Sequence, residues 1–284
     1  MRRFAFALGI SLAAACLARA DTAADSPAPQ KKLLVMATIA PMYCFAKNVA
    51  ADLADVEMIV PPGIQSRGFA PSQYQVTTIL QADVVVENGF GFEPWMDALV
   101  AKGLKPGAVR VIAARGTGPG IPGLPGDPNS PPGDAPLDPL KPVNPHVWLD
   151  PLMAIKELQN IRDALMARDP AHADDYLANE NRYEAALRDL DDEVGRTTVD
   201  IRKRRLFCAS DAFSYFLSRY EFPVAMTARE ADASLVPKEP ARKSNQERSR
   251  VILADPMESG PASTDFYEKA TRANAEALRE GLSQ

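Results

Sequence analysis

The stretch LLVMATIAPMYCFAKNVAADLADVEMIVPP, residues 33–62, decides the fold. Residues 33–40 form a short apolar run that predicts a buried strand, and Pro41 ends this strand before a helix that continues to about Leu53. Residues 56–62 predict a second short strand, which a proline pair ends. A strand, a helix and a strand at this spacing are typical of a parallel sheet with helices on its faces.

The same alternation continues along the chain on both sides of an irregular middle region. The N-terminal part adds a helix at 71–82, a strand at 83–89, a helix at 93–103 and a strand at 109–114. A second unit begins with a strand at 204–210 and a helix at 211–220, and it closes with a strand at 251–256 and a helix at 263–282. We therefore expect an α/β protein with mainly parallel sheets.

Two different segments connect these units. Residues 116–145, GTGPGIPGLPGDPNSPPGDAPLDPLKPVNP, are dominated by glycine and proline and predict an exposed loop, flexible over 116–143. Residues 152–194 carry apolar side chains at steps of three and four, which predicts long helical material broken at most once, around Asp169 and Pro170.

The first 20 residues, MRRFAFALGISLAAACLARA, predict a secretory signal peptide that is removed before Asp21. Lipid attachment at Cys16 is the alternative. Since three arginines leave with this segment, the formal net charge at pH 7 changes from −5 to −8. We expect an exported, periplasmic protein, and its acidic balance disfavours nucleic acid as a partner, because phosphates require basic patches. Cys44 and Cys208 remain, and the sequence leaves their pairing open.

One of only two histidines lies in the octapeptide NPHVWLDP, residues 144–151. Pro145 and Pro151 stiffen the backbone around His146, and Asp150 is placed to cap a helix that begins at Pro151. Such a turn holds an imidazole in a fixed direction, although a surface histidine in a proline-rich turn is an equal interpretation. The other histidine, His172, lies in a polar break, which is typical of a solvated surface residue.

Several motifs, in this order, make the chain resemble the periplasmic metal-binding proteins that deliver zinc or manganese to ABC importers. VEMIVPPG followed by PSQY resembles the first ligand loop of that family, and NPHVWLDP resembles the second ligand motif. ADVVVENGFGFEPWMDAL is similar to the strand, turn and helix between them, and DPAHADDYLANENRYEAAL to the long helix. DAFSYF resembles the third ligand region, and ADPM the fourth. The likeness covers most of residues 33–280.

The resemblance implies two α/β lobes joined by one long rigid helix, with a single divalent ion, Zn²⁺ or Mn²⁺, in the cleft between the lobes. It places an N-terminal lobe at 30–149, the linking helix at 150–196 and a C-terminal lobe at 201–284. The last lobe is expected to be shortened, because residues 221–250 lack a helix and a strand that the family has there. The implied partner is the permease of an ABC importer, and the protein is expected to be a monomer.

Carried over position by position, the resemblance gives His146 and Asp255 as metal ligands. Two further ligand positions, usually histidine, are occupied by Arg67 and Ser210 and are expected to line the cleft. A guanidinium has no lone pair to donate and repels a cation, and a serine hydroxyl is a weak ligand, so we expect weakened metal binding. Additional ligand candidates are Asp211 and Glu93, and after them Cys44 and Cys208.

Three functions therefore compete. The first is the solute-binding component of a zinc or manganese importer. The second is a binding protein whose ligand has changed to an anion or a metal chelate that Arg67 holds, although Arg67 could equally form an ion pair with Asp255 or Asp211. The third, a hydrolase that uses His146 and Asp255, is disfavoured, because the sequence has no nucleophile elbow, phosphate-binding glycine loop or paired-histidine motif.

Overall fold

The computed structural model describes residues 31–117, 144–204, 206–208, 211–227 and 254–283. All the elements below belong to one unit, residues 32–284. The predicted signal peptide, most of the predicted Gly/Pro-rich loop and Ser210 lie outside the described residues, as does most of the interval in which a deletion was expected.

A parallel four-stranded sheet forms the N-terminal half of the described fold. Its strands are β1 (Leu33–Ala37), β2 (Ala54–Met58), β3 (Val84–Glu87) and β4 (Val109–Ile112), arranged in the order β2-β1-β3-β4. Leu33 pairs with Ala54 across β1 and β2, and Val84 pairs with Val109 across β3 and β4. Each of these strands overlaps one of the four predicted from the apolar runs. Short apolar runs between helices bury their side chains on both faces of such a sheet.

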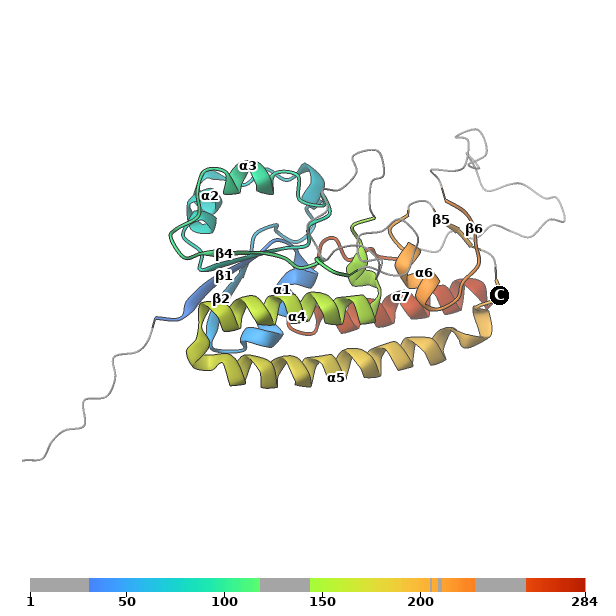
Figure 1. Cartoon of the computed structure of the whole chain (residues 1–284). Coiled ribbons are helices and arrows are strands. Elements are labelled where there is room, and N and C mark those ends of the chain that lie inside the picture. The colour runs from blue at the N-terminus through green and yellow to red at the C-terminus, as the bar shows by residue number, and fades with distance from the viewer. Residues whose placement is uncertain (1–30, 118–143, 205, 209–210, 228–253, 284) are drawn as a thin grey trace, which may run out of the picture. The chain divides into compact units, whose positions relative to one another are not determined.

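Helices cover both faces of this sheet (Figure 1). One face packs against α2 (Gln73–Leu80) and α3 (Met96–Val100), and the other packs against α1 (Ala40–Ala50) and the long C-terminal helices. Alternate residues of β1 therefore enter different cores, with Val35 on the α1 side and Met36 on the α2 side. The two central strands, β1 and β3, are covered on both faces, which explains why they are nearly continuous apolar runs.

The helical region after the turn at His146 consists of two helices. Helix α4 (Pro151–Arg168) and helix α5 (Ala173–Thr198) run side by side in opposite directions, joined by a 3₁₀ turn at Pro170–His172 (Figure 1). The expectation of one continuous helix over 150–196 is therefore wrong, whereas the predicted single break is confirmed. Pro170 disfavours the helical conformation of Asp169, whose ψ of 74° turns the chain, so α4 cannot continue.

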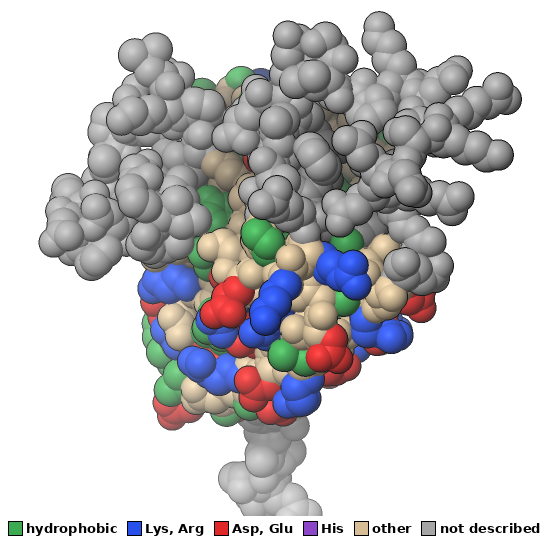
Figure 2. All heavy atoms as spheres, turned by 90° about the vertical axis from the view of Figure 1, so that its right-hand side faces the viewer, with side chains coloured by type: hydrophobic (Ala, Val, Ile, Leu, Met, Phe, Trp, Pro, Cys, Tyr) green, Lys and Arg blue, Asp and Glu red, His purple; other side chains and the backbone are tan. Residues whose placement is uncertain are grey.

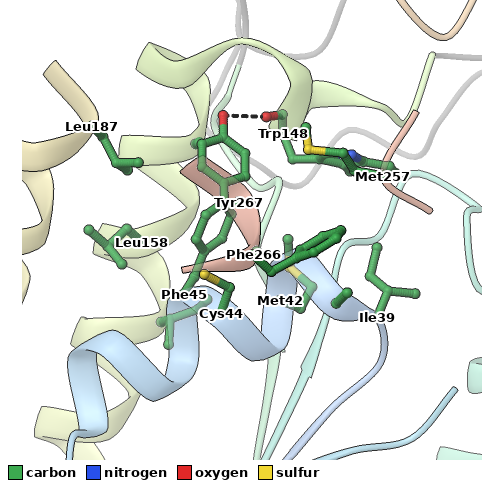
Figure 3. Close-up of a cluster of buried hydrophobic side chains, with 14 of the residues drawn as sticks. Ile39, Met42, Cys44, Phe45, Trp148, Leu158, Leu187, Met257, Phe266 and Tyr267 are labelled. Carbon is green, nitrogen blue, oxygen red and sulfur yellow. Dashed lines mark hydrogen bonds between the residues drawn. The ribbon is translucent and has the colours of Figure 1, made fainter. Parts of the chain in front are cut away.

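The C-terminal helix α7 (Phe266–Leu282) closes the core beside α1 and α5. Figure 3 shows Tyr267 of α7 next to Phe45 of α1, with ring centroids 5.0 Å apart. The hydroxyl of Tyr267 donates to the carbonyl oxygen of Trp148 at 2.6 Å, the dashed line in Figure 3. Trp148 is itself fully buried and lies beside Met257 in the same view. The turn that carries His146 is thereby anchored to the end of the chain.

A second, smaller parallel sheet pairs β5 (Leu206–Cys208) with β6 (Val224–Thr227), next to α6 (Ser214–Arg219). Strand β6 was not predicted, and it is defined by its pairing with β5. The strand predicted at 251–256 falls partly outside the described residues, and its described part, 254–256, is irregular.

The predicted fold class is confirmed, since two parallel sheets with covering helices make up the described fold. The boundaries of the two lobes remain a prediction. No helix in the described ranges has the length and apolar character needed to cross a membrane.

Candidate metal centre

His146 lies at the carboxyl edge of the four-stranded sheet. Asn88, the residue directly after β3, donates from Nδ2 to the carbonyl oxygen of Pro145 at 3.0 Å. The strand order reverses between β1 and β3, which connect to opposite sides of the sheet. In open α/β sheets, ligands bind outside the carboxyl ends of the strands at this reversal point, so His146 lies where the topology favours a site.

Glu93 organises the strand ends beneath His146. Its carboxylate accepts from the Thr38 hydroxyl at 2.7 Å, from the Asn88 backbone N–H at 2.9 Å and from the Gly89 backbone N–H at 3.0 Å. Complete burial raises the pKa of Glu93 to about 7 despite these three donors. Gly89 adopts φ 92°, and an added Cβ would lie 2.4 Å from Ile112, so only glycine fits this turn. Glu93 therefore fixes the ends of β1 and β3 relative to each other, and Asn88 at the end of β3 contacts the turn that carries His146.

The imidazole of His146 is held in one orientation. Asn144 donates from Nδ2 to the Asp211 carbonyl oxygen, which leaves its Oδ1 as an acceptor for the His146 backbone N–H at 3.0 Å and for the His146 Nδ1–H at 2.7 Å. The ring also packs between Phe92 and Trp148, at centroid distances of 5.6 and 5.1 Å. Because Nδ1 is the donor to Asn144, Nε2 is the nitrogen that remains for a ligand.

Glu258 supplies the carboxylate that faces this nitrogen. Its Oε1 lies 2.7 Å from His146 Nε2. The side chain of Glu258 is 23% exposed, and that of His146 is 5% exposed. The segment around Glu258 is fixed from both sides, since Trp148 Nε1 donates to the Pro256 carbonyl oxygen at 2.9 Å and Met257 is fully buried. Met257 adopts φ 58°, which turns the chain so that the next side chain reaches His146.

Asp255, the predicted carboxylate ligand, lies next to the site with its side chain engaged elsewhere. Its Oδ1 accepts from the Met257 backbone N–H at 2.8 Å, and the residue is exposed. Asn274 of α7 holds its backbone through two hydrogen bonds of 2.7 Å. The carboxylate of Asp255 thus shapes the turn that presents Glu258.

Arg67, in the loop after β2, lies near the site through its contact with Phe92. Its Cζ lies 6.0 Å from the centroid of Phe92, the ring that packs on His146. The backbone N–H of Gly63, in the same loop, donates to the Ser259 hydroxyl at 2.5 Å, so this loop contacts the segment that carries Glu258. Among the described residues Arg67 forms no ion pair, so the alternative of a salt bridge to Asp255 or Asp211 is not what the structure contains.

Of the remaining candidate metal ligands, some make other contacts and some lie outside the described residues. The backbone carbonyl of Asp211 joins Asn144 to the first turn of α6. Cys44 is a free, buried thiol 3.3 Å from the Tyr183 hydroxyl, and burial raises the pKa of Cys44 to about 12, so a thiolate ligand is unfavourable there. Ser210 and the side chain of Cys208 lie outside the described residues.

The site therefore presents one imidazole nitrogen and one carboxylate beside a fixed positive charge. Within the described ranges, no group of three or more histidine, cysteine or acidic side chains is arranged to hold an ion. A separate cavity of about 600 Å³ lies at the far end of α5, and Figure 2 shows basic and acidic side chains intermixed on that end of the molecule. It contains none of the predicted site residues, and it is lined by Asp191, Asp192, Gly195, Arg196, Val199, Arg202, Arg219 and Tyr220.

Sequence reasoning missed Glu258, although a signal was present. The motif resemblance pointed to Asp255, and Glu258 is the next acidic residue in ADPMES. The sequence does not show that Asp255 caps its own turn, which is a frequent use of a short acidic side chain.

Comparisons with known proteins identify a family that this chain matches over most of its length. The family described as "Zinc-uptake complex component A periplasmic" matches residues 35–244. The high-affinity zinc uptake system protein ZnuA of Bacillus subtilis is 32% identical over 225 residues, which cover 78% of this chain and 70% of that protein. The iron-binding protein YfeA of Yersinia pestis is 29% identical over 205 residues, covering 68% of this chain and 58% of YfeA.

Solved structures show the same fold. The zinc-bound ZnuA-like domain of Streptococcus pneumoniae AdcA superposes with a TM-score of 0.65 at 24% identity, covering 89% of this chain and 100% of that domain. FpvC of Pseudomonas aeruginosa, in complex with Mn²⁺, gives a TM-score of 0.69 at 21% identity, with coverages of 89% and 99%.

Proposed function

This chain belongs to the family of periplasmic zinc-uptake component A proteins, and from that premise we propose that it binds a divalent metal ion, Zn²⁺ or Mn²⁺, between His146 and Glu258. The observation that carries the proposal is the contact of 2.7 Å between His146 Nε2 and Glu258 Oε1. Imidazole nitrogen and carboxylate oxygen are ligands that both ions accept.

The metal ion would replace the proton that His146 Nε2 and Glu258 Oε1 share in their hydrogen bond. Bond lengths near 2.0–2.2 Å put a nitrogen and an oxygen ligand of a tetrahedral ion about 3.3 Å apart. Glu258 would have to withdraw by only a fraction of an ångström, and its segment is half-buried rather than fully packed. His146 would not move, because Asn144, Phe92 and Trp148 fix its ring.

Binding is expected to be weak. Two protein ligands leave at least half of a tetrahedral coordination sphere to water, and the positive charge of Arg67 opposes the ion. The ligand set of His146 with Asp255, which the resemblance implies, is the competing assignment for the same place.

The proposal extends to the biological setting of the family. We expect the protein to be exported through residues 1–20, with lipid attachment at Cys16 as the alternative, and to act in the periplasm. Its partner would be the permease of an ABC importer, and it would act as a monomer that carries a solute and catalyses no reaction. An acidic chain is not expected to bind nucleic acid.

Zinc titration of four proteins, purified without chelator, tests the proposal. His146→Ala and Glu258→Gln should each remove binding, because each deletes one of only two protein donors. Asp255→Asn is the matched control, since an amide oxygen can still accept from the Met257 N–H, and it should bind as the unmodified protein does. Isothermal titration calorimetry with ZnCl₂ and MnCl₂ measures binding by all four proteins.

Other outcomes of these titrations would assign the metal ligands differently. Loss of binding in Asp255→Asn with retention in Glu258→Gln would make Asp255 the ligand. Unchanged binding in His146→Ala would place the ion elsewhere and end the proposal.

A further inference from the structure

Arg67 carries a guanidinium beside the candidate site, and no carboxylate within the described ranges forms an ion pair with it. It is exposed, and among the described residues its recorded side-chain contact is with the face of Phe92. The nearby carboxylates are engaged: that of Glu258 by His146, and that of Asp255 by the Met257 N–H. Glu93 is buried beneath three donors. A ligand could therefore supply the missing negative charge.

The loop that carries Arg67 is fixed, which makes its position part of the site. Trp95 Nε1 donates to the Ser66 carbonyl oxygen at 3.0 Å, and Phe69 packs edge-on against Trp95 at 5.4 Å. At the other end of the loop, the Gly63 N–H donates to the Ser259 hydroxyl, next to Glu258. A guanidinium on a preorganised loop loses less entropy when it forms a bidentate hydrogen bond.

We infer that the site takes its divalent ion as a complex with a small di- or tricarboxylate, and that Arg67 binds a carboxylate of that chelator. This inference rests on the proposed metal site. His146 and Glu258 fill two coordination positions, and a chelating carboxylate fills those that remain.

The charges at the site favour this form of the ligand. A free divalent cation is repelled by Arg67, whereas a zinc–citrate complex carries negative charge and is attracted to it. Arginine and carboxylate pair through two parallel N–H···O bonds, which gives geometric selectivity for a planar carboxylate. Arg67 would thus act as a specificity determinant for the chelated ion.

Native mass spectrometry and calorimetry in a non-coordinating buffer test the inference, with three titrants: zinc chloride, sodium citrate, and equimolar zinc citrate. The unmodified protein should form a complex of one protein, one zinc and one citrate, and should bind sodium citrate alone much more weakly. Arg67→Ala should lose the ternary complex and bind zinc citrate about tenfold more weakly. It should bind zinc chloride equally well or better.

Arg196→Ala is the matched control, because Arg196 is also exposed and forms no ion pair among the described residues, and it lies on α5 outside the site. It should behave as the unmodified protein does. Equal binding of zinc citrate by the unmodified protein and Arg67→Ala would overturn the inference while leaving the metal site intact. Zinc binding that persists unchanged in His146→Ala, or its absence with every titrant, would instead refute the proposed function.

Discussion

His146 shows how a single residue is prepared for a ligand by the groups around it. Asn144 fixes which ring nitrogen carries the proton, and Phe92 and Trp148 fix the plane of the ring. Glu258 then faces the one nitrogen that is left. Affinity at such a site is determined by how many further donors surround this nitrogen and by the charge of Arg67.

Conversion of Arg67 and Ser210 to histidine is expected to restore tight zinc binding. The double variant removes the opposing charge and offers two imidazole donors at the positions where the motif resemblance implies histidines. We expect the dissociation constant for Zn²⁺ to fall by about a hundredfold or more, since each added ligand contributes at least about 1.4 kcal/mol. Competition with a zinc-binding dye measures the change.

The single variants are the controls for this experiment. Arg67→His alone should improve binding less than the double variant. Tight binding by the unmodified protein would reveal a ligand among residues that the structure does not describe. No improvement in the double variant would mean that positions 67 and 210 do not converge on His146.

For single residues, the sequence predicted the turn that holds His146, but it did not predict which acidic side chain points toward it. The turn at 144–151 predicted a fixed imidazole, because two prolines and a capping aspartate leave the backbone few choices. Glu258 was not predicted, because its approach to His146 depends on the left-handed conformation of Met257 and on the burial of that side chain under Trp148. Neither is encoded in a local pattern.

The hairpin of α4 and α5 is the element with the most distinctive construction. Its turn is held by Asp169, whose carboxylate accepts from Tyr176 at 3.0 Å and contacts His172 Nδ1 at 2.6 Å. Tyr176 is fully buried, so its hydroxyl depends on this acceptor. The two helices are therefore joined by a polar contact within a largely apolar packing.

Asp169→Ala is expected to lower the free energy of unfolding by about 1–3 kcal/mol, because the buried Tyr176 hydroxyl loses its acceptor. Asp189→Ala, at an exposed position on α5 with no ion pair among the described residues, should change it by less than about 0.5 kcal/mol. Urea unfolding followed by circular dichroism gives both values. Asp169→Ala combined with Tyr176→Phe should recover part of the loss, and equal losses in Asp169→Ala and Asp189→Ala would refute this role.

Elements with a clear local pattern were predictable, and elements set by tertiary contacts were not. The strands at 33–37 and 84–87 and the helices on either side of Pro170 follow from apolar periodicity and from proline. Whether the chain continues straight or folds back at Pro170 depends on the packing of α4 on α5, and strand β6 depends on pairing with β5. A local pattern contains neither kind of information.

Across the whole molecule, buried acids set the dependence of stability on pH. Burial raises the pKa of Glu93 to about 7 and that of Asp150 to about 6. Burial also raises the pKa of Glu87, and it raises that of Glu157 well above its ordinary value. Ion pairs lower the pKa of Asp83 and Glu184, and these two groups affect stability only in more acidic solution.

Stability is therefore expected to decrease as the pH rises from about 4.5 to about 7. In this range the unfolded chain has already released these protons while the folded protein still binds them, so each group favours unfolding by up to about 1.4 kcal/mol per pH unit. Urea unfolding should give a free energy at least about 2 kcal/mol lower at pH 7.5 than at pH 5. A free energy that rises over this interval would contradict the assignment of raised pKa values.

Glu157 provides the sharpest test of this explanation. It is fully buried on α4, and neither carboxylate oxygen has a hydrogen-bond partner among the described residues. Glu157→Met should raise the free energy of unfolding by about 1–3 kcal/mol at pH 7.5 and by less at pH 5, because burial raises the pKa of Glu157 and its destabilising effect therefore grows as the pH rises. Glu280→Met, at an exposed position on α7, should have little effect at either pH. Equal gains for Glu157→Met at both pH values would show that ionisation is not the cause.

The contact between His146 and Glu258 joins residues that are 112 positions apart in the chain. The segment of Glu258 is held in turn by α7, through Asn274 on Asp255. During synthesis, the ribosome has therefore finished the whole four-stranded sheet long before His146 and Glu258 can meet. The unfinished polypeptide therefore lacks the proposed site, and metal binding at this site would have to follow completion of the chain.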